Sequence, residues 1–376
     1  MRVAWLFEYP TLHGGERSLL ATLPGLRQER IEPVALAPRE GPLANELTRS
    51  GVPLVPLHVT EHGRRPPRDV LRASLLAQLA TLRPALLHAN SLSMGRLSGP
   101  VALRAGMPSI AHLRDIVGLS AAAVADLSCH ARLLAVSQAT REFHLRQGVA
   151  ADRTYVCHNG VDLDLFGPRP PTCWLHGRLG LPNDAVLVAT IGQLVMRKGH
   201  DVLVRAAARI KDCLPNVHWL VIGERHSQKA EAVAYEAALH VAVASAGLAR
   251  RFHFLGSLES VADVLPELAL LVHPARQEPL GRVLLEAAAA GVPTVASNVG
   301  GTREIFPDPA MARLVEADDD EALAAAVADL ITSPEEREKM SLAARRRIEG
   351  HFDVRRAAEA LVGHYRAIAS KTERSE

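Results

Sequence analysis

The stretch LALLVHPARQEPLGRVLLEAAAAGVPTVAS, from Leu268 to Ser297, indicates the fold class. It opens with a short continuous apolar run, Leu268–His273, which predicts a strand covered on both faces. The segment Arg282–Ala290 then predicts a helix, and Thr294–Ala296 predicts a second strand. A strand, a helix and a strand in succession are the unit from which parallel sheets with right-handed crossovers are built.

The same alternation of short apolar runs and longer helical segments continues on both sides of this stretch. In the first half the predicted strands are Val3–Tyr9, Pro33–Ala37, Ala85–His88, Ser109–His112 and Arg132–Val136, and the predicted helices are Glu16–Arg27, Pro42–Arg49, Arg68–Leu82 and Ala139–Gln147. In the second half the further strands are Ala185–Ile191, His218–Ile222 and His253–Leu255, and the further helices are Asp201–Lys211, Ala230–Ala246, Glu321–Thr332 and Pro334–Gly350. The predicted fold class is therefore α/β, with parallel sheets.

Chain length and a local change of composition predict two domains. The chain has 376 residues, and one domain commonly holds about 100–200 residues. Segment 167–182 is rich in Pro and Gly and lacks hydrophobic periodicity, as a linker should. We therefore expect an N-terminal domain over residues 1–166, a C-terminal domain over residues 183–350, and a C-terminal helix within residues 351–376. In doubly wound sheets of this kind, ligands lie at the carboxyl ends of the strands, beside helix N-termini.

The composition is that of an ordinary globular protein. Hydrophobic residues make up 48% of the chain, charged residues make up 22%, and the formal net charge is +2. These values exclude a mostly disordered chain and argue against a dedicated nucleic-acid-binding protein, which carries a strongly basic surface. The four cysteines form no CxxC pair, so neither a zinc ribbon nor a redox motif is predicted.

The N-terminus and the hydropathy predict a cytoplasmic protein. The apolar run in MRVAWLFEYP is too short for a signal peptide and is soon followed by Pro10 and Gly14. No stretch approaches 18 uninterrupted apolar residues, so we expect no transmembrane helix. A small number of scattered cysteines fits a reducing compartment.

The first 166 residues are mildly basic. They hold 18 Arg and 14 Asp plus Glu, and part of the excess lies at Arg64, Arg65, Arg68 and Arg72. One interpretation is a surface that meets an anionic membrane, at the inner membrane face, or a phosphate-bearing acceptor. The other interpretation is a solvated face of a helix.

The loop and helix that follow Leu268–His273 carry the most informative polar residues. Gly281 opens the predicted helix, and backbone N–H groups at a helix start attract phosphate or sugar oxygens. Glu278 lies in the loop and Glu286 lies within the first turns of the helix, eight residues later. Carboxylates accept hydrogen bonds from vicinal hydroxyls, so the pair suits a ribose or a sugar. Taken alone, such a pair is more often two unrelated surface residues.

This Glu-x7-Glu pair resembles the donor-binding signature of the retaining glycosyltransferases of family 4, also called glycosyl transferases group 1, which have the GT-B fold. Six other segments resemble elements of the same family in the same order: HGGERSLL (His13–Leu20), LAVSQATREF (Leu134–Phe143), CHNGVDLDLF (Cys157–Phe166), GQLVMRKGHDVL (Gly192–Leu203) and the short VIGE and FLG motifs at Val221–Glu224 and Phe254–Gly256. The resemblance extends from about Val3 to Glu304. It implies two Rossmann-like domains whose parallel sheets face each other across a cleft. It also implies that the last helix, Val354–Ser370, packs back on the N-terminal domain.

The resemblance implies a metal-independent hexosyltransferase. Such an enzyme moves a sugar from a nucleotide sugar, here a UDP- or GDP-sugar, to a sugar, lipid-linked or small-molecule acceptor with retention of configuration. Polysaccharide, glycan and glycolipid biosynthesis are the processes implied. The leaving diphosphate helps to deprotonate the acceptor in this family, so no separate catalytic base is expected, and no cofactor is expected.

The predicted phosphate site lies at Lys198 and Arg197. Cations beside a helix N-terminus stabilise a departing diphosphate. The family usually begins this segment Gly-Arg, whereas this chain has Gln193 after Gly192, and Arg197 is the residue expected to supply the missing charge. The alternative for Lys198 is a surface lysine that caps a helix.

The remaining C-domain candidates are donor ligands. The resemblance implies that Glu286 binds the nucleotide, and that Glu278, Gly281 and the backbone near Leu280 hold the sugar. His273 ends the strand before this loop, and it either takes part in the site or only positions the loop.

The first-domain candidates begin with Gly14 and Gly15, which follow the first strand and allow a ligand to approach the backbone. The family usually has Gly-Gly-Ala-Glu here, so either His13 replaces the first glycine or one residue of the pattern is absent. The alternative to a ligand-binding loop is a simple turn. His112 matches the family position of a histidine beside the donor sugar. The resemblance implies a hydrogen bond from His112 to a sugar hydroxyl rather than proton abstraction, and the alternative is a strand-end histidine satisfied by the backbone.

Three further residues are weaker, acceptor-side candidates. His88 and Asn90 lie at a strand end and either contact the acceptor or serve only the structure, and Asn159 is expected at the hinge or the cleft. Asp318, Asp319 and Asp320 lead into a predicted helix and are interpreted as N-cap charge rather than as a metal site.

Two other kinds of protein remain open at this point. A nucleotide-sugar epimerase or a phosphorylase has the same architecture. A catalytically idle protein that binds a sugar nucleotide is a second alternative, which the departures at Gln193 and His13 keep open.

Overall fold

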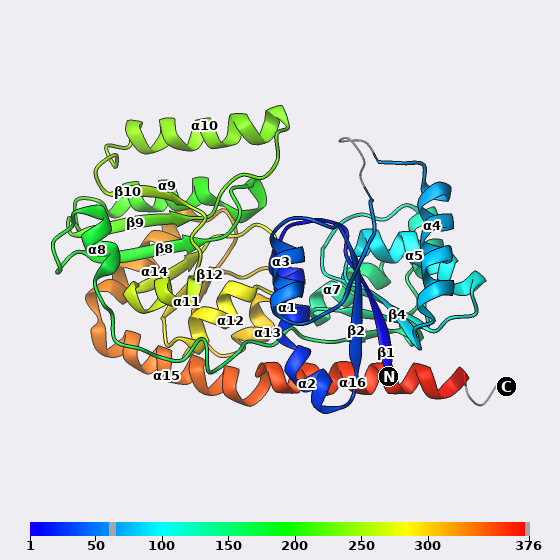
Figure 1. Cartoon of the computed structure of the whole chain (residues 1–376). Coiled ribbons are helices and arrows are strands. Elements are labelled where there is room, and N and C mark those ends of the chain that lie inside the picture. Colours follow the sequence, from blue (N-terminus) through cyan, green and yellow to red (C-terminus); the bar gives the residue numbers. More distant parts are fainter. Residues whose placement is uncertain (60–64, 373–376) are drawn as a thin grey trace. The chain divides into compact units, whose positions relative to one another are not determined.

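The computed structural model describes residues 1–59 and 65–372 (Figure 1). The chain forms two compact units. The first comprises Met1–Gly160 together with Val354–Glu376, and the second comprises Val161–Asp353. The helix α16 (Val354–Thr372) therefore belongs to the same unit as the N-terminus.

The first unit is built on a seven-stranded sheet of order β3-β2-β1-β4-β5-β6-β7. The strands are β1 (Arg2–Leu6), β2 (Glu32–Ala37), β3 (Leu54–Pro56), β4 (Leu86–Ala89), β5 (Ser109–Leu113), β6 (Arg132–Ala135) and β7 (Thr154–Val156). All neighbouring pairs are parallel. Their carboxyl ends consequently meet at one edge of the sheet, where the following loops can gather side chains.

Two apolar cores cover the two faces of this sheet, because side chains alternate along a strand. Val3 and Trp5 of β1 pack in one core with α1 (Gly14–Ala21), α2 (Leu23–Gln28), α3 (Pro42–Arg49) and α16. Ala4 and Leu6 pack in the other core with α4 (Arg68–Leu82), α5 (Leu92–Arg104) and α6 (Ala121–Leu127). The helix α7 (Gln138–Leu145) and the 3-10 turn η1 (Ala151–Arg153) connect β6 to β7.

The second unit is built on a six-stranded sheet of order β10-β9-β8-β11-β12-β13, again with parallel neighbours. The strands are β8 (Val186–Ile191), β9 (Val217–Ile222), β10 (Phe252–Gly256), β11 (Leu270–His273), β12 (Thr294–Ser297) and β13 (Arg313–Val315). The helices are α8 (Trp174–Leu179), α9 (His200–Ile210), α10 (Ala230–Ser245), α11 (Val261–Val264), α12 (Arg282–Ala289), α13 (Thr302–Ile305), α14 (Asp320–Thr332) and α15 (Pro334–His351). The 3-10 turns are η2 (Met196–Lys198) and η3 (Leu265–Glu267).

The predicted α/β fold class is confirmed: both units hold a parallel sheet with helices on its faces. The predicted linker, segment 167–182, contains a helix. It includes α8, and Leu175 of this helix is fully buried within the second unit. Most of its Pro and Gly residues, including Pro170, Pro171 and Gly180, are exposed.

Several element boundaries also differ from the predictions. Gly14 and Gly15 are the first residues of α1 rather than a loop before it. The predicted helix Glu16–Arg27 is two helices that meet at Thr22, because Pro24 cannot continue the backbone hydrogen bonding of the first. The short strands β3, β7 and β13 were not predicted, since three residues show no periodicity.

The helix α5 was missed because its sequence contains Gly95, Gly99 and Pro100. These glycines serve close packing. A Cβ atom on Gly99 would lie 2.1 Å from the carbonyl oxygen of Asp126, at the end of α6. Tertiary contact therefore overrides the weak helix propensity of the segment.

In the described ranges, no helix combines the length and the apolar character that a membrane-crossing segment requires.

Candidate active site

In the second unit, Lys198, His273 and Glu278 form one buried cluster at the carboxyl edge of the sheet. β11 ends at His273, and the loop that follows returns Glu278 to it, so that His273 Nε2 lies 2.8 Å from Glu278 Oε2. Lys198 Nζ lies 2.5 Å from the same oxygen. The predicted residues Lys198 and Glu278 are thus brought together with His273, which orients the carboxylate.

Burial and charge act in opposite directions on this cluster. Burial raises the pKa of Glu278, but the Lys198 charge and the His273 hydrogen bond outweigh it, so the pKa lies well below its ordinary value. Burial, aided by the Lys198 charge, lowers the pKa of His273. Glu278 is therefore ionised, and a neutral His273 donates its Nε2 hydrogen to it. The ammonium group of Lys198 and the carboxylate of Glu278 therefore lie side by side as a cation and an anion.

Two glycines bring the loops and helix starts of this edge into contact. Gly199, with a φ of 68°, precedes α9, and a Cβ on it would lie 1.8 Å from the carbonyl oxygen of Pro274. Gly281, with a φ of 103°, precedes α12. Both positions lie in the left-handed region that glycine adopts freely. The first turns of both helices are therefore available as positive ends of helix dipoles.

The loop after β8 passes directly beside the lysine. A Cβ on Gly192 would lie 3.6 Å from Lys198 Cε. Arg197, the predicted second cation, is exposed, and its carbonyl accepts a 2.8 Å hydrogen bond from the backbone N–H of Arg276. His200, the first residue of α9, is 1% exposed, neither of its ring nitrogens has a hydrogen-bond partner, and burial lowers its pKa to about 4.

Arg276 holds the lysine segment in place and was missed by the sequence reasoning. Its Nη1 and Nη2 lie 2.9 and 2.6 Å from the two carboxylate oxygens of Asp201, and Nη1 also donates to the carbonyl of Met196 at 2.7 Å. Tyr235 donates to Asp201 at 2.8 Å. Although burial raises the pKa of Asp201, the hydrogen bonds from Arg276 and Tyr235 bring it below its ordinary value.

Glu286 lies on α12, 6% exposed, and its Oε1 accepts a 2.6 Å hydrogen bond from Arg282 Nε. The i,i+4 spacing of Arg282 and Glu286 in the sequence would have predicted this ion pair on a helix. Leu280 is 1% exposed, and the carbonyl of Glu278 accepts a hydrogen bond from the N–H of Gly301 at 3.0 Å. The loop between the two glutamates is thereby fixed at both ends.

The first unit has a second cluster, centred on Arg114 just after β5. Its Nη1 donates to Asn159 Oδ1 at 2.8 Å, its Nη2 donates to Asn90 Oδ1 at 2.8 Å, and its Nε donates to the carbonyl of Asn90 at 3.0 Å. A Cβ on Gly15 would lie 3.0 Å from Arg114 Cδ, so this glycine makes room for the arginine. Burial lowers the pKa of Arg114 to about 10, and it stays charged at neutral pH. Sequence reasoning missed Arg114 because a single strand-end arginine has no motif of its own.

His112 and His88 extend this cluster into the core. His88 Nε2 lies 2.7 Å from His112 Nδ1, and Arg114 Nη2 lies 3.2 Å from the same Nδ1. His88 Nδ1 lies 2.5 Å from the hydroxyl of Tyr365. Burial lowers the pKa of both histidines well below the ordinary value, and the Arg114 charge adds to this effect. Both rings are therefore neutral at pH 7.

This geometry shows which contacts the three weaker acceptor-side candidates make. His88 is fully buried and uses both ring nitrogens internally, so it has no atom left for an acceptor. Asn159 and Asn90 hold Arg114 through their side-chain oxygens. The Nδ2 atom of Asn90 is buried without a hydrogen-bond partner.

The interpretation of Asp319 as an N-cap is confirmed, whereas Asp318 accepts a hydrogen bond from Arg276 Nε at 2.7 Å. Asp319 accepts the N–H of Ala322 at 2.8 Å and caps α14, and Asp320 pairs with Arg205. Throughout the described part of the chain, no three His, Cys, Asp or Glu side chains are grouped as metal ligands.

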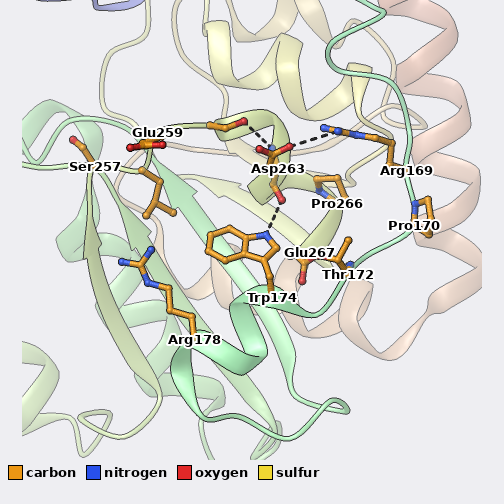
Figure 2. Close-up of a pocket in the computed structure, with 12 residues that line it drawn as sticks. Arg169, Pro170, Thr172, Trp174, Arg178, Ser257, Glu259, Asp263, Pro266 and Glu267 are labelled. Atoms are coloured by element: carbon orange, nitrogen blue, oxygen red, sulfur yellow. Dashed lines mark hydrogen bonds and ion pairs between the residues drawn. The ribbon is translucent and has the colours of Figure 1, made fainter. Parts of the chain in front are cut away.

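The second unit also contains a cavity of about 670 Å³ that none of the predicted site residues lines. Figure 2 shows Trp174 of α8 donating to the carbonyl of Asp263, with Arg169 paired to the carboxylate of Asp263. Thr172 binds Glu267 through its backbone N–H and its hydroxyl, at 2.6 and 2.9 Å. These contacts attach the segment before α8 to α11 and η3, which is a structural role.

Comparison with known proteins bears on both units. A family model described as Glycosyltransferase Family 4 matches residues 12–165, and one described as Glycosyl transferases group 1 matches residues 175–347. The chain belongs to the group 1 glycosyl transferases. The matches include both clusters, since they contain Arg114 as well as Lys198 and Glu278.

Curated relatives of this glycosyltransferase are 29–35% identical to it over the aligned parts of the chain. A D-inositol 3-phosphate glycosyltransferase of Streptomyces scabiei is 29% identical over 74% of this chain and 67% of its own length. One from Geodermatophilus obscurus is 35% identical over 60% of this chain and 49% of its own length. The lipopolysaccharide core biosynthesis mannosyltransferase LpcC of Rhizobium leguminosarum is 33% identical over 57% of this chain and 59% of its own length. The chain thus spans about half to two thirds of the length of these relatives.

Solved structures support the fold. Anabaena Alr3699/HepE in complex with UDP-glucose has a TM-score of 0.85 and 22% identity, covering 98% of this chain and 100% of that chain. Sucrose-phosphate synthase from Thermosynechococcus elongatus has a TM-score of 0.80 and 20% identity, covering 98% and 99%. The GT-B fold of this glycosyltransferase follows from these likenesses.

Proposed function

We propose that this glycosyltransferase moves a sugar from a nucleotide diphosphate sugar to a hydroxyl of an acceptor, with retention of anomeric configuration. The bond between the anomeric carbon and the diphosphate oxygen breaks, and a bond to the acceptor oxygen forms on the same face. The acceptor proton passes to the leaving diphosphate. The observation that carries the proposal is the buried Lys198–Glu278–His273 cluster beside the start of α9.

The second unit supplies the groups that a diphosphate requires. Lys198 and the N-terminus of α9 would stabilise the negative charge that grows as the sugar leaves. Arg197, exposed on the same segment, would add the cation that Gln193 does not provide. These charges do the work that a divalent ion does in other transferases, so metal independence belongs to the proposal.

The two glutamates suit hydroxyl groups. Glu286, now paired with Arg282, would bind the ribose hydroxyls, and Glu278 would accept from the sugar. The backbone at Leu280 and Gly281 would hold the sugar oxygens at the start of α12. In the first unit, Gly14, Gly15 and His112 would serve a sugar hydroxyl, with His112 as a hydrogen-bond donor rather than a base.

The relatives suggest which substrates to test first. Because the Anabaena structure contains UDP-glucose, UDP-sugars are the first donors, with GDP-sugars second. The names of the curated relatives point to phosphate-bearing and glycan acceptors, in keeping with a role in polysaccharide, glycan or glycolipid biosynthesis.

Contact with an anionic membrane is a weaker part of the proposal. Arg65 pairs with Glu8, and Arg68 and Arg72 pair with Asp126, so much of the basic charge is matched within the unit. Arg64, the fourth residue of the predicted basic surface, lies outside the described residues. Sedimentation with vesicles of phosphatidylglycerol tests this contact.

Calorimetry with UDP, GDP and ADP, without added metal, tests the donor site. The wild-type protein should bind one of the three, and Glu286→Ala should lose at least tenfold in affinity, the cost of one charge-assisted hydrogen bond of about 1.5–3 kcal/mol. Glu338→Ala, an exposed glutamate of the same unit, is the matched control. Equal affinity of Glu286→Ala and wild type would remove Glu286 from the site.

A catalytically idle sugar-nucleotide-binding protein is the second candidate, and the glutamine at position 193 favours it. Binding of a nucleotide sugar without hydrolysis or transfer to any acceptor would support it. Conversion of the sugar in the absence of acceptor would instead indicate an epimerase.

A further inference from the structure

Four side chains of the first unit form one continuous chain of hydrogen bonds. The indole Nε1 of Trp5 lies 3.1 Å from the Tyr365 hydroxyl, which lies 2.5 Å from His88 Nδ1. His88 Nε2 in turn lies 2.7 Å from His112 Nδ1. Three of the side chains are fully buried and His112 is 4% exposed, so water has little access to the chain.

The sheet register places these residues together. Trp5 of β1 is opposite His88 of β4, and His88 is opposite Ile110 of β5, two residues before His112. Side chains two residues apart on a strand share a face, so Trp5, His88 and His112 lie on one face of the sheet. The helix α16 packs on that face and inserts Tyr365 between the first two.

The Trp5 end sets the direction of the hydrogen bonds. An indole N–H can only donate, so the oxygen of Tyr365 accepts from Trp5. The one hydroxyl proton of Tyr365 then goes to His88 Nδ1. Since the neutral His88 ring carries its proton on the other nitrogen, Nε2, it donates to His112 Nδ1.

The Arg114 end independently requires the same direction. A guanidinium can only donate, and Arg114 Nη2 lies 3.2 Å from His112 Nδ1. That nitrogen must therefore be an acceptor. The reverse direction would set two N–H groups against each other at His112 and would leave the Tyr365 proton in the core without an acceptor, at a cost of about 1–3 kcal/mol for such a group.

We propose that Tyr365 and His88 are positioning residues that fix His112 in the tautomer protonated on Nε2. Both hydrogen bonds of His112 use Nδ1, so Nε2 is the ring nitrogen left for a ligand. It offers an N–H donor and cannot accept a proton.

The role of this donor rests on the proposed function. A sugar hydroxyl oxygen is the ligand that an N–H donor fits, and His112 would bind and orient it. Because Nδ1 is already engaged by two donors, His112 cannot act as the base that deprotonates an acceptor. Base-free transfer of this kind requires the proton to leave with the diphosphate.

The tautomer can be measured on the ligand-free wild-type protein. Histidine labelled with ¹⁵N gives distinct signals for protonated and unprotonated ring nitrogens, and His112→Asn assigns the resonances of His112. We expect at pH 7.5 a protonated Nε2 and an unprotonated Nδ1. A protonated Nδ1 in the wild-type protein would overturn the proposal, whatever the activity of the enzyme.

Tyr365→Phe tests the positioning role, and Tyr155→Phe is the matched control. The Tyr155 hydroxyl binds only the nearby carbonyl of Asp152 on the surface of the same unit. In Tyr365→Phe we expect signals of both His88 tautomers, a reduced Nε2–H population at His112, and a fall in kcat of about tenfold, equal to one misplaced hydrogen bond. The KM for the donor should change by less than about twofold, because nucleotide binding is assigned to the second unit.

The outcomes separate this proposal from the proposed function. Unchanged histidine signals and unchanged kcat in Tyr365→Phe would refute the positioning role while transfer activity stands. The expected tautomer in a protein that neither binds nor turns over any nucleotide sugar would refute the proposed function and leave the hydrogen-bond chain intact. If Tyr365→Phe does not fold, the wild-type measurement still decides.

Discussion

The polar clusters of the two units occupy similar places in their sheets but differ in chemistry. Each lies where parallel strands end and helices begin. In the second unit the groups are ionic, with Lys198 against Glu278 and Arg276 against Asp201. In the first unit two neutral histidines and a tyrosine are joined in line, and Arg114 is the cation beside them.

The difference follows from what each cluster can stabilise. Paired charges respond to the appearance of a new charge, such as that of a leaving diphosphate. A chain of neutral hydrogen bonds fixes which atom donates, which suits the recognition of uncharged hydroxyls. Under the proposed function, the second unit would supply electrostatic stabilisation and the first unit would orient hydroxyl groups.

The largest expected effect comes from removing the lysine of the ionic cluster in the second unit. Lys198→Ala should lower kcat by about 10²–10³, because a cation that stabilises the leaving group acts mainly in the transition state. Single-turnover kinetics measures it, with Lys339→Ala, an exposed lysine of the same unit, as the control. Near-normal turnover of a folded Lys198→Ala protein would rule out this assignment.

A second effect concerns the support of Lys198 rather than its charge. Arg276→Ala should destabilise the second unit by about 2 kcal/mol, since Asp201 loses its partly buried partner, and should weaken nucleotide binding. Denaturant unfolding and calorimetry measure the two quantities. Arg276→Lys keeps the charge but not the two-pronged contact, and should lie between alanine and wild type. Full affinity in Arg276→Ala would mean that the loop keeps its shape without this contact.

Acid should lower the stability of the first unit, because this unit contains buried neutral histidines. Burial lowers the pKa of His130 to about 4, whereas an unfolded histidine titrates near 6.5. Between these two pKa values the unfolded chain binds more protons than the folded chain. The contribution of His130 to folding stability is therefore complete above pH 6.5 and is lost as the pH falls toward 4. His130 alone should account for about 1–2 kcal/mol between pH 7 and pH 5.

Urea unfolding of His130→Asn and wild type at pH 7 and pH 5 checks this sign. The variant should show a smaller loss on acidification, and His58→Asn, at an exposed position, should behave as wild type. An equal loss in His130→Asn would assign the acid sensitivity to other groups.

The smallest expected effect separates local helix stability from the site. Asp319→Ala removes the N-cap of α14 and should cost about 1 kcal/mol of stability. It should leave kcat unchanged, because Asp319 contacts neither cluster. Thermal unfolding and steady-state kinetics on the same preparation distinguish the two, and a clear fall in kcat would show that the helix is coupled to the site.

The sequence was informative wherever the chemistry is local. The strand, loop and helix around Glu278 and Gly281 lie within one short segment, so their periodicity and glycine pattern predicted both the fold and the placement of the carboxylate. Lys198 was found because GQLVMRKGHDVL resembles the phosphate-binding segment of the family, and it lies two residues before α9.

The missed residues act across long separations. Tyr365 and His88 are 277 positions apart, and Arg276 and Asp201 are 75 positions apart. No periodicity links such pairs, and tertiary packing decides which polar groups meet. The helix α5 was missed for the related reason that its glycines are explained only by the close approach of Asp126.

The meeting of Trp5 and Tyr365 has a consequence for how the protein is made. The strand that carries the tryptophan is synthesised before the second unit, and the helix that carries the tyrosine is synthesised after it. Until then, the first unit lacks one element of its core, and its histidines lack the partner that orients them. A nascent chain that still lacks α16 is thus expected to remain without a finished first-unit site.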